Sequence, residues 1–409
     1  MNLALAVTIK STTTAKRLSE RGVIDRTMVL IKIAFALGRK PQNGPQKVSN
    51  DCHGRDGCDG SDLDDFQPRH IKQSTQVADG NNVAEESSRT WHRRQYFADQ
   101  VTKCSGGRLS VELFSAGEIV PAFESIDAVK SGTVEMGHGC PYYWKGKAPA
   151  AEFVSNFPFG LTAQEYNAWY HFGGGDKLCD ELYADAFGCK FIVCGNTGVQ
   201  HPGWSRKEVN TLADFKGLKI RMPGLGGEIM KRLGATVVNL PGGEVPTALA
   251  SGTIDWAEWN NPYGEASMGF WRHAKYYYTP GWHEPGTCLE LFVNKAAWDG
   301  LEDDLKAIVQ QCAFSTTQVM LSEFQARSGP VLDQFVNKHG VIIKKLNDEQ
   351  IKKLGETAGE VLGEIVERDA MAKKVFTSMN KFRKEQVAYS NVAEGDFLQA
   401  RSLDYSWPA

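Results

Sequence analysis

The chain has 409 residues, of which 42% are hydrophobic, enough to bury a substantial core in two or more lobes. Its 46 Lys and Arg against 49 Asp and Glu give a net charge of −3, which excludes the strongly basic balance of a nucleic-acid binder. The longest apolar stretch, Met28 to Leu37, has about half of the roughly 20 residues that a membrane-spanning helix needs. We therefore predict a globular protein with no membrane span and no nucleic acid among its partners.

Residues 1–95 differ in composition from the rest of the chain, because they lack sustained periodicity and are rich in Gly, Asp and Arg. This composition predicts a disordered segment. The acidic cluster Asp56–Asp65 does not fit a calcium loop, because Cys58 stands where the EF-hand pattern has Asp or Asn. The chain has nine cysteines and no CxxC pair, and we interpret them mainly as small buried side chains.

From Tyr96 onward the sequence predicts alternating helices and strands, beginning with a helix and the strand Leu109–Phe114. Such alternation favours α/β layers with mostly parallel sheets. An internal repeat supports two related units, because Ala128–Gly139 is matched by Ala248–Trp259, each with a helix end, an SGT turn and a strand. Two such lobes would face each other across a cleft, with 137–143 and 258–263 at the carboxyl ends of their strands.

The region 301–403 has the spacing of amphipathic helices. We expect Gly329–Pro330 to kink or break this helical run. The helices would either pack on the lobes of their own chain or be exchanged between two protomers.

Several polar residues stand where a predicted strand gives way to a Gly- or Pro-rich loop. Arg221 ends the strand LKIR and precedes a Gly-rich turn into a helix, a place that suits a carboxylate ligand, although many strand-end arginines are structural. Glu258 and Glu284 with the amide oxygen of Gln200 could form an oxygen cage for a hard cation, but each Glu could also be a solvated or capping residue. His283 precedes Glu284, but the pair does not form an HExxH motif. The alternative interpretation is a metal-dependent enzyme that acts on a small organic acid through Glu258, Glu284 and His283, and the absence of a recognisable nucleophile or general-base pair argues against it.

Linked motifs in the right order resemble one family. GRLSVELFSAGEIVP, the RMPG-x-GGE run, ALASGTIDWAEW-x2-PY and AKYYYTPGWHEPG resemble the DctP-like solute-binding proteins of TRAP transporters, in particular the monocarboxylate/2-oxoacid-binding (TakP-like) branch. The resemblance covers about residues 96–403. It implies an α/β, two-lobed periplasmic-binding-protein-like (Venus flytrap) fold with C-terminal helices, and not an enzyme.

The resemblance also implies a site and partners. Arg221 would anchor a small monocarboxylate such as a 2-oxoacid or lactate. Tyr143, one of the aromatic residues that crowd the same stretches of sequence, would either line the ligand pocket or fill the core. Gln200, Glu258, the backbone carbonyl of Trp259 and Glu284 would hold a cation, Na+ or Ca2+, that bridges to the ligand. The partners would be the TRAP membrane subunits and a second copy of the chain bound through the C-terminal helices, and the location would be the periplasm.

The expected division of the chain follows from the same resemblance. The first lobe would comprise 96–192 and 257–290, and the second 193–256 and 291–365. A helical extension would occupy 366–409.

The sequence departs from the family pattern in two ways. His201–Pro202 stands where the family usually has Met-Gly, and Asn260–Asn261 replaces a more usual apolar-Gly pair. Residues 1–95 show neither a recognisable signal peptide nor the family's first strand, whereas 72–95 read one base later permit a sequence like that strand. We therefore hypothesise that a shift of reading frame near Gln95 separates an out-of-frame segment from the rest.

Overall fold

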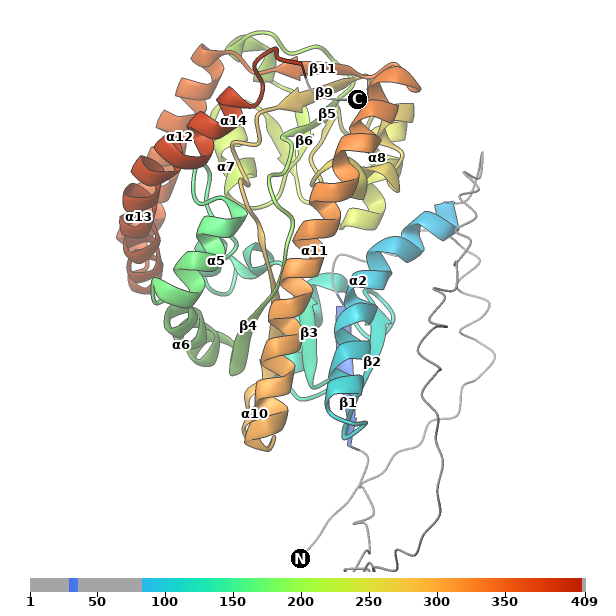
Figure 1. Ribbon diagram of the computed structural model, residues 1–409. Coiled ribbons are helices and arrows are strands. Elements are labelled where there is room, and N and C mark those ends of the chain that lie inside the picture. The colour runs from blue at the N-terminus through green and yellow to red at the C-terminus, as the bar shows by residue number, and fades with distance from the viewer. Residues whose placement is uncertain (1–28, 36–82, 407–409) are drawn as a thin grey trace, which may run out of the picture. The chain divides into compact units, whose positions relative to one another are not determined.

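The computed structural model describes residues 29–35 and 83–406, and its strands form two sheets (Figure 1). The first sheet has the order β2-β1-β3-β10-β4. Its strands are β1 (Val29–Phe35), β2 (Leu109–Ser115), β3 (Met136–Gly139), β4 (Cys189–Asn196) and β10 (Cys288–Asn294). The second sheet has the order β11-β9-β5-β8-β6-β7. Its strands are β5 (Gly203–Ser205), β6 (Lys219–Arg221), β7 (Thr236–Val238), β8 (Trp256–Ala257), β9 (Tyr276–Thr279) and β11 (Ile342–Lys345).

Helices follow most strands and pack on the sheets. The shorter ones are α3 (Ser125–Lys130), α4 (Ala151–Val154), α5 (Ala163–Phe172), α6 (Gly175–Phe187), α7 (Gly224–Arg232), α8 (Val245–Ser251), α9 (Pro262–Ala266), α10 (Lys295–Asp299) and α14 (Asp396–Ala400). The longer ones are α2 (Val83–Cys104), α11 (Asp303–Asn337), α12 (Asp348–Arg368) and α13 (Ala370–Ser390). Single turns lie at η1 (Ala122–Glu124), η2 (Pro141–Trp144), η3 (Leu212–Phe215), η4 (Gly242–Glu244), η5 (Phe270–Arg272) and the π-helical η6 (Asn391–Gly395).

The expected predominance of parallel pairing is wrong for the first sheet. There β1 runs antiparallel to β2 and β3, and β10 runs antiparallel to β3 and β4. In the second sheet β6 is parallel to β7 and β8, whereas β5 is antiparallel to β8 and β9. The reason lies in the connections: β10 and β5 enter their sheets from the other sheet rather than through a helical crossover, so they can run in the opposite direction.

The expected lobe boundaries differ from the sheets for two strands, β9 and β10. Strand β9 pairs in the second sheet, although 257–290 was expected in the first lobe, and most of β10 lies beyond residue 290 yet pairs in the first sheet. The chain therefore returns to the first sheet through 280–287, a loop with no periodicity by which its direction could be read from sequence.

Part of the segment expected to be disordered forms regular structure. Residues 29–35 pair with β2 on one side and β3 on the other, because those strands expose backbone donors and acceptors between them. Residues 83–95 belong to α2. The acidic cluster 56–65, Cys52 and Cys58 lie outside the described residues.

The repeat inferred from sequence is confirmed as helix, turn and strand in both units. Helix α3 is followed by a turn and β3, and α8 by a turn and β8. The turns correspond closely, because Gly132 and Gly252 have positive φ angles of 76° and 78°. The hydroxyls of Ser131 and Ser251 donate to backbone carbonyls three residues earlier at 3.0 and 3.1 Å. The same local sequence thus closes the same turn in two different sheets.

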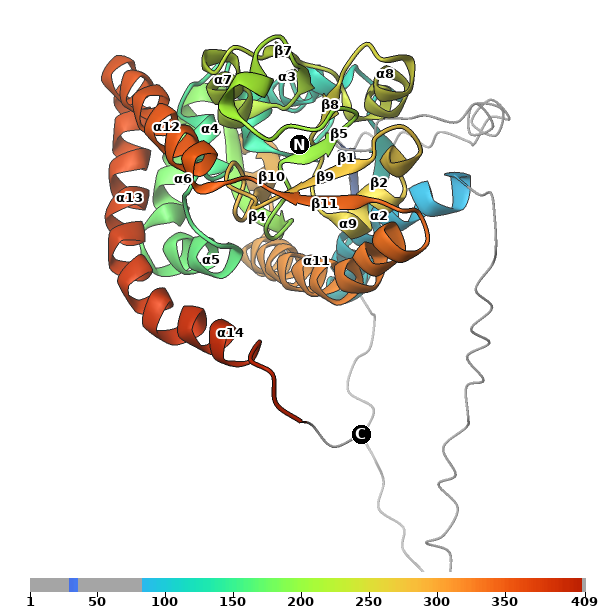
Figure 2. The same ribbon diagram turned by 90° about the horizontal axis from the view of Figure 1, so that it is seen from above.

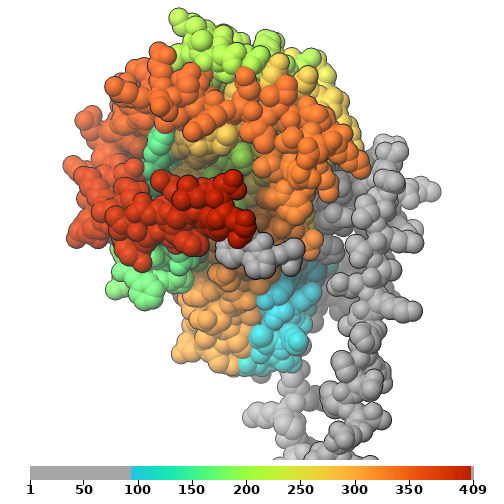
Figure 3. All heavy atoms as spheres, turned by 45° about the horizontal axis from the view of Figure 1, so that its top comes forward, coloured from blue at the N-terminus to red at the C-terminus, as the bar shows by residue number. Residues whose placement is uncertain are grey.

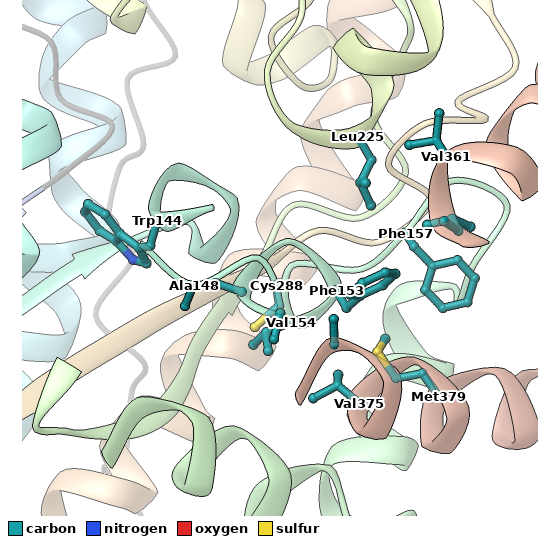
Figure 4. Packing of buried hydrophobic residues seen from close by; sticks show 14 of the residues in the cluster. Trp144, Ala148, Phe153, Val154, Phe157, Leu225, Cys288, Val361, Val375 and Met379 are labelled. Atoms are coloured by element: carbon teal, nitrogen blue, oxygen red, sulfur yellow. The ribbon is translucent and has the colours of Figure 1, made fainter. Parts of the chain in front are cut away.

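The C-terminal helices pack on their own chain in this structure. Helix α11 contacts β4 and α2 beside the first sheet and α9 beyond it (Figure 1). It continues through Pro330, so the expected break there is not seen. Helices α12 and α13 contact α7, α4 and α6, and Figure 4 shows Phe153 and Phe157 of the α4 region directed toward Val375 and Met379 of α13.

The described cysteines are free and mostly buried, as expected. Those in the core are Cys140, Cys179, Cys189, Cys194, Cys288 and Cys312, whereas Cys104 is exposed. None of the helices in the described ranges combines the length and apolar character needed to cross a membrane.

Glu290 is a fully buried carboxyl in β10. It accepts hydrogen bonds from Trp144 Nε1 at 2.6 Å and from the Tyr183 hydroxyl. Burial raises its pKa to about 8 from an ordinary 4.5, although both hydrogen bonds oppose the shift. The folded state therefore binds this proton more tightly than the unfolded state. The stabilisation of the folded state by this bound proton is complete below about pH 4.5 and is lost as the pH rises to about 8.

We predict that Glu290→Gln flattens this dependence, because an amide has no proton to lose. The decrease in the free energy of unfolding between pH 5 and pH 8 should be smaller in the variant than in the wild type. The difference between the two decreases should be at least about 1 kcal/mol. Urea denaturation at several pH values measures this difference. Glu360→Gln on the exposed face of α12 is the control, and equal pH slopes in the wild type and Glu290→Gln would contradict the assignment.

Candidate functional site

Arg221 and Glu258 meet because their strands are parallel neighbours. Arg221 ends β6 and pairs in register with Ala257 of β8, so Glu258 emerges at the same edge of the second sheet. Arg221 Nη1 donates to the backbone carbonyl of Glu258 at 2.9 Å and to its Oε2 at 3.1 Å. Both residues are 1% exposed, so this ion pair lies in a water-poor environment where its two hydrogen bonds are strong.

Arg221 also reaches the first sheet. Its Nη2 donates to the Tyr143 hydroxyl at 3.4 Å, and Tyr143 lies in η2, directly after β3. The guanidinium carbon lies 5.3 Å from the ring centre of Trp259, a cation–π distance. The guanidinium donors of Arg221 that were expected to bind a carboxylate ligand are thus partly engaged by Glu258 and Tyr143. Residues from both sheets converge on this guanidinium.

Glu258, His283 and Glu284 form a buried cluster. Each offers one ligand atom, and these atoms lie within 4.8 Å of one another. Burial raises the pKa of Glu258 to about 7, and the attraction of Arg221 only partly offsets it. Burial followed by the charge of Glu258 raises the pKa of Glu284 to about 7. Burial lowers the pKa of His283 to about 4, so the imidazole is neutral near pH 7.

Gln200 lies beside this cluster, in the segment that leads from β4 to β5. Its backbone N–H donates to the Glu284 carbonyl at 3.0 Å. Its side-chain Nε2 donates to the hydroxyls of Thr197 at 3.0 Å and Thr287 at 2.9 Å. The Thr287 hydroxyl in turn donates to Glu284 Oε2 at 2.5 Å. Because both amide hydrogens are engaged, the amide oxygen is the atom left for another partner.

The chemistry of the unpartnered atoms fits a bound cation. Buried atoms without a hydrogen-bond partner at this site are Gln200 Oε1, Glu258 Oε1, His283 Nδ1 and His283 Nε2. An unsatisfied buried polar atom costs about 1–3 kcal/mol, so several in one place call for a ligand. Carboxylate and amide oxygens are the donors that hard cations take. Gln200, Glu258 and Glu284 therefore supply a suitable set.

The structure brings the site residues expected from sequence into one region. Tyr143 and Glu258 contact Arg221, and Gln200 is bonded to Glu284. Trp259 lies against Arg221 through its indole, and a ligand role for its backbone carbonyl stays a prediction. Sequence analysis missed Thr197 and Thr287, because a single hydroxyl in a loop carries no pattern.

The two departures from the family pattern have structural partners. His201 stacks on Tyr277 with ring centres 4.6 Å apart, and its Nδ1 lies 3.2 Å from the Tyr278 carbonyl. Asn261 donates from Nδ2 to the Thr197 carbonyl at 2.9 Å and caps α9 through its Oδ1. Both positions therefore pack and bond within the chain next to the site.

Comparison with known proteins places these features in a family. The model of bacterial extracellular solute-binding proteins, family 7 (DctP), matches residues 80–369. The chain is 38% identical over 297 residues to the monocarboxylate 2-oxoacid-binding periplasmic protein of Nostoc sp., a match that covers 73% of this chain and 81% of that protein.

Two solved structures are similar over most of their length. One is a TRAP transporter solute-binding protein from Bordetella bronchiseptica, a dimer with copurified calcium and picolinate. It is 31% identical to this chain, the match covers 78% of this chain and 94% of that chain, and the TM-score is 0.75. The other is a TRAP periplasmic solute-binding protein from Pseudoalteromonas atlantica with bound sodium and pyruvate. It is 37% identical to this chain, the match covers 76% of this chain and 94% of that chain, and the TM-score is 0.73. The chain thus has the two-lobed fold of these proteins and belongs to the DctP family of TRAP transporter solute-binding receptors, which are not enzymes.

Proposed function

We propose that this protein binds a small monocarboxylate, such as pyruvate or lactate, through Arg221 and a cation held by Gln200, Glu258, Trp259 and Glu284. The observation that carries the proposal is the convergence of a buried guanidinium and unpartnered carboxylate and amide oxygens at one place. The Nostoc, Bordetella and Pseudoalteromonas relatives, which bind 2-oxoacids, picolinate or pyruvate, support this ligand class.

The residues suggest how the ligand would be held. A carboxylate needs charge-assisted donors, and Arg221 supplies them once the ligand competes for Nη2 with Tyr143. A cation would draw the ligand from the opposite side by its charge. Glu258 would link Arg221 to the cation, because its Oε2 accepts a hydrogen bond from Arg221 while its Oε1 has no hydrogen-bond partner.

Binding would also connect the two lobes. Tyr143 follows a strand of the first sheet and Arg221 ends a strand of the second. A ligand held between them stabilises the closed arrangement by the contacts that it makes only there. The closed receptor would then deliver the acid to the TRAP membrane subunits from the periplasm.

Calorimetric titration of pyruvate in the presence of calcium tests the role of Arg221. We expect saturable binding by the wild type and at least about 100-fold weaker binding by Arg221→Met, because a buried charge-assisted pair is lost. Arg272→Met is the matched control, since Arg272 is an exposed arginine that also lies over an indole, that of Trp271 at 4.8 Å. Unchanged affinity in a folded Arg221→Met would contradict the proposal.

A second prediction concerns the scaffold of the cation site. Thr287→Val removes the hydroxyl that links Gln200 to Glu284 and should weaken calcium binding about 10-fold, the effect of about 1.4 kcal/mol. Thr287→Ser keeps the hydroxyl and should bind calcium like the wild type. Calcium titration measured by calorimetry decides this, and equal affinities in the Val and Ser variants would exclude the hydroxyl from the site.

We also propose that two copies associate through their C-terminal helices. Apolar side chains are exposed along this region, namely Val387, Tyr389, Val392, Phe397, Leu398 and Leu403. Figure 2 shows α14 leading away from the other helices, and Figure 3 shows this C-terminal segment at the surface. Phe397 is 61% exposed, which is unfavourable for an aromatic ring unless a partner covers it.

The mass in solution, measured by light scattering, tests this association. We expect a dimer for the wild type and a monomer for the double variant Phe397→Asp, Leu398→Asp, because buried carboxylates would oppose the contact. Gln399→Asp in the same helix adds a charge without removing an apolar side chain and should stay dimeric. A monomeric wild type would contradict the proposal.

A further inference from the structure

His283 is a buried imidazole for which the hydrogen bonds of the fold provide no partner. It is 1% exposed, and neither ring nitrogen has a hydrogen-bond partner among the described residues. A buried histidine usually bonds through at least one nitrogen, since each unsatisfied atom costs about 1–3 kcal/mol. The neighbouring carboxylates make this lack of partners informative.

The distances around His283 fit coordination better than hydrogen bonding. Nε2 lies 3.5 Å from Glu258 Oε1, beyond the usual range of about 2.7–3.2 Å for an N–H···O bond. Two donor atoms about 2.4 Å from one ion and at right angles to each other are separated by about 3.4 Å. Opposite donors are about 4.8 Å apart at the same ion–donor distance, and the ligand atoms of Glu258, His283 and Glu284 all lie within 4.8 Å.

The imidazole is also fixed in place. A Cβ at Gly226 of α7 would lie 3.0 Å from the Cβ of His283, so the helix packs closely on this residue. The ring centre of the preceding residue, Trp282, lies 5.6 Å from that of His283. An imidazole held in this way offers its nitrogen to the cluster without a large loss of side-chain freedom.

We propose that His283 is a cation ligand through Nε2 and that the resulting mixed nitrogen and oxygen site selects a borderline divalent cation over sodium. This inference rests on the cation site of the proposed function and adds a ligand to it. Imidazole suits borderline divalent ions such as zinc, whereas sodium and calcium, both hard ions, favour oxygen donors.

Charge balance points the same way. Glu258, Glu284 and a bound monocarboxylate contribute three negative charges when ionised, and Arg221 contributes one positive charge. A divalent cation brings the buried site to neutrality, whereas sodium leaves one net negative charge. Net charge in a buried site is costly, so the closed, ligand-bound protein should favour the divalent ion.

Cadmium-113 NMR of the full chain tests the ligand assignment. The protein is labelled with nitrogen-15 histidine and carries Cys104→Ser, which removes an exposed thiol, because cadmium binds thiolates. Cys52→Ser and Cys58→Ser are added for the same reason, since these two residues lie outside the described ranges. We expect one bound cadmium resonance split by one-bond coupling to nitrogen-15. The splitting should vanish in His283→Gln and in His283→Asn, and it should persist in His273→Gln, an exposed histidine.

Calorimetry on the same proteins tests the selectivity. Zinc should support pyruvate binding at a concentration at least about 100-fold lower than sodium does, and His283→Gln should reduce that ratio at least 10-fold. An unsplit cadmium resonance together with intact calcium-dependent pyruvate binding would overturn the ligand role of His283 and leave the proposed function standing. Failure of folded wild type to bind any cation or pyruvate would overturn both.

Discussion

Two chain segments that pass from one sheet to the other lie side by side, and the site depends on this contact. Residues 197–202 lead from β4 to β5, and 280–287 lead from β9 to β10. They are joined by backbone bonds from Thr197 N to the Thr287 carbonyl and from Gln200 N to the Glu284 carbonyl. The approach is so close that a Cβ at Gly281 would lie 1.8 Å from the Gln200 backbone oxygen. Glycine is therefore required there.

This contact brings polar groups together in the buried interior of the protein. Backbone groups of the crossing segments satisfy one another, whereas side-chain atoms of Gln200, Glu258 and His283 are left unpartnered. Buried polar groups are normally paired, so several unpaired ones at one place call for a ligand. The pKa of each of the carboxyls Glu258 and Glu284 is raised to about 7 by burial, and a cation is the partner that would stabilise their ionised form.

The same arrangement distributes the site over both sheets. Arg221 and Glu258 come from parallel neighbours in the second sheet, and Tyr143 follows β3 in the first. A small acid that contacts both groups would favour one relative position of the lobes, which a receptor can use to signal that it is loaded. The long helix α11 also runs from the first sheet toward the second (Figure 1).

The sequence by itself determined the family and the two related units, and it predicted the residues that the structure brings together at the candidate site. Its motifs lie in a characteristic order, and local signals such as the SGT turn depend only on neighbouring residues. Only the tertiary structure decided the antiparallel course of β5 and β10, the role of Thr287 and the position of His283 beside Glu258. These features follow from contacts between residues that lie from 25 positions apart, as Glu258 and His283, to more than 100 apart, as Cys189 and Asn294, and no local periodicity encodes such contacts.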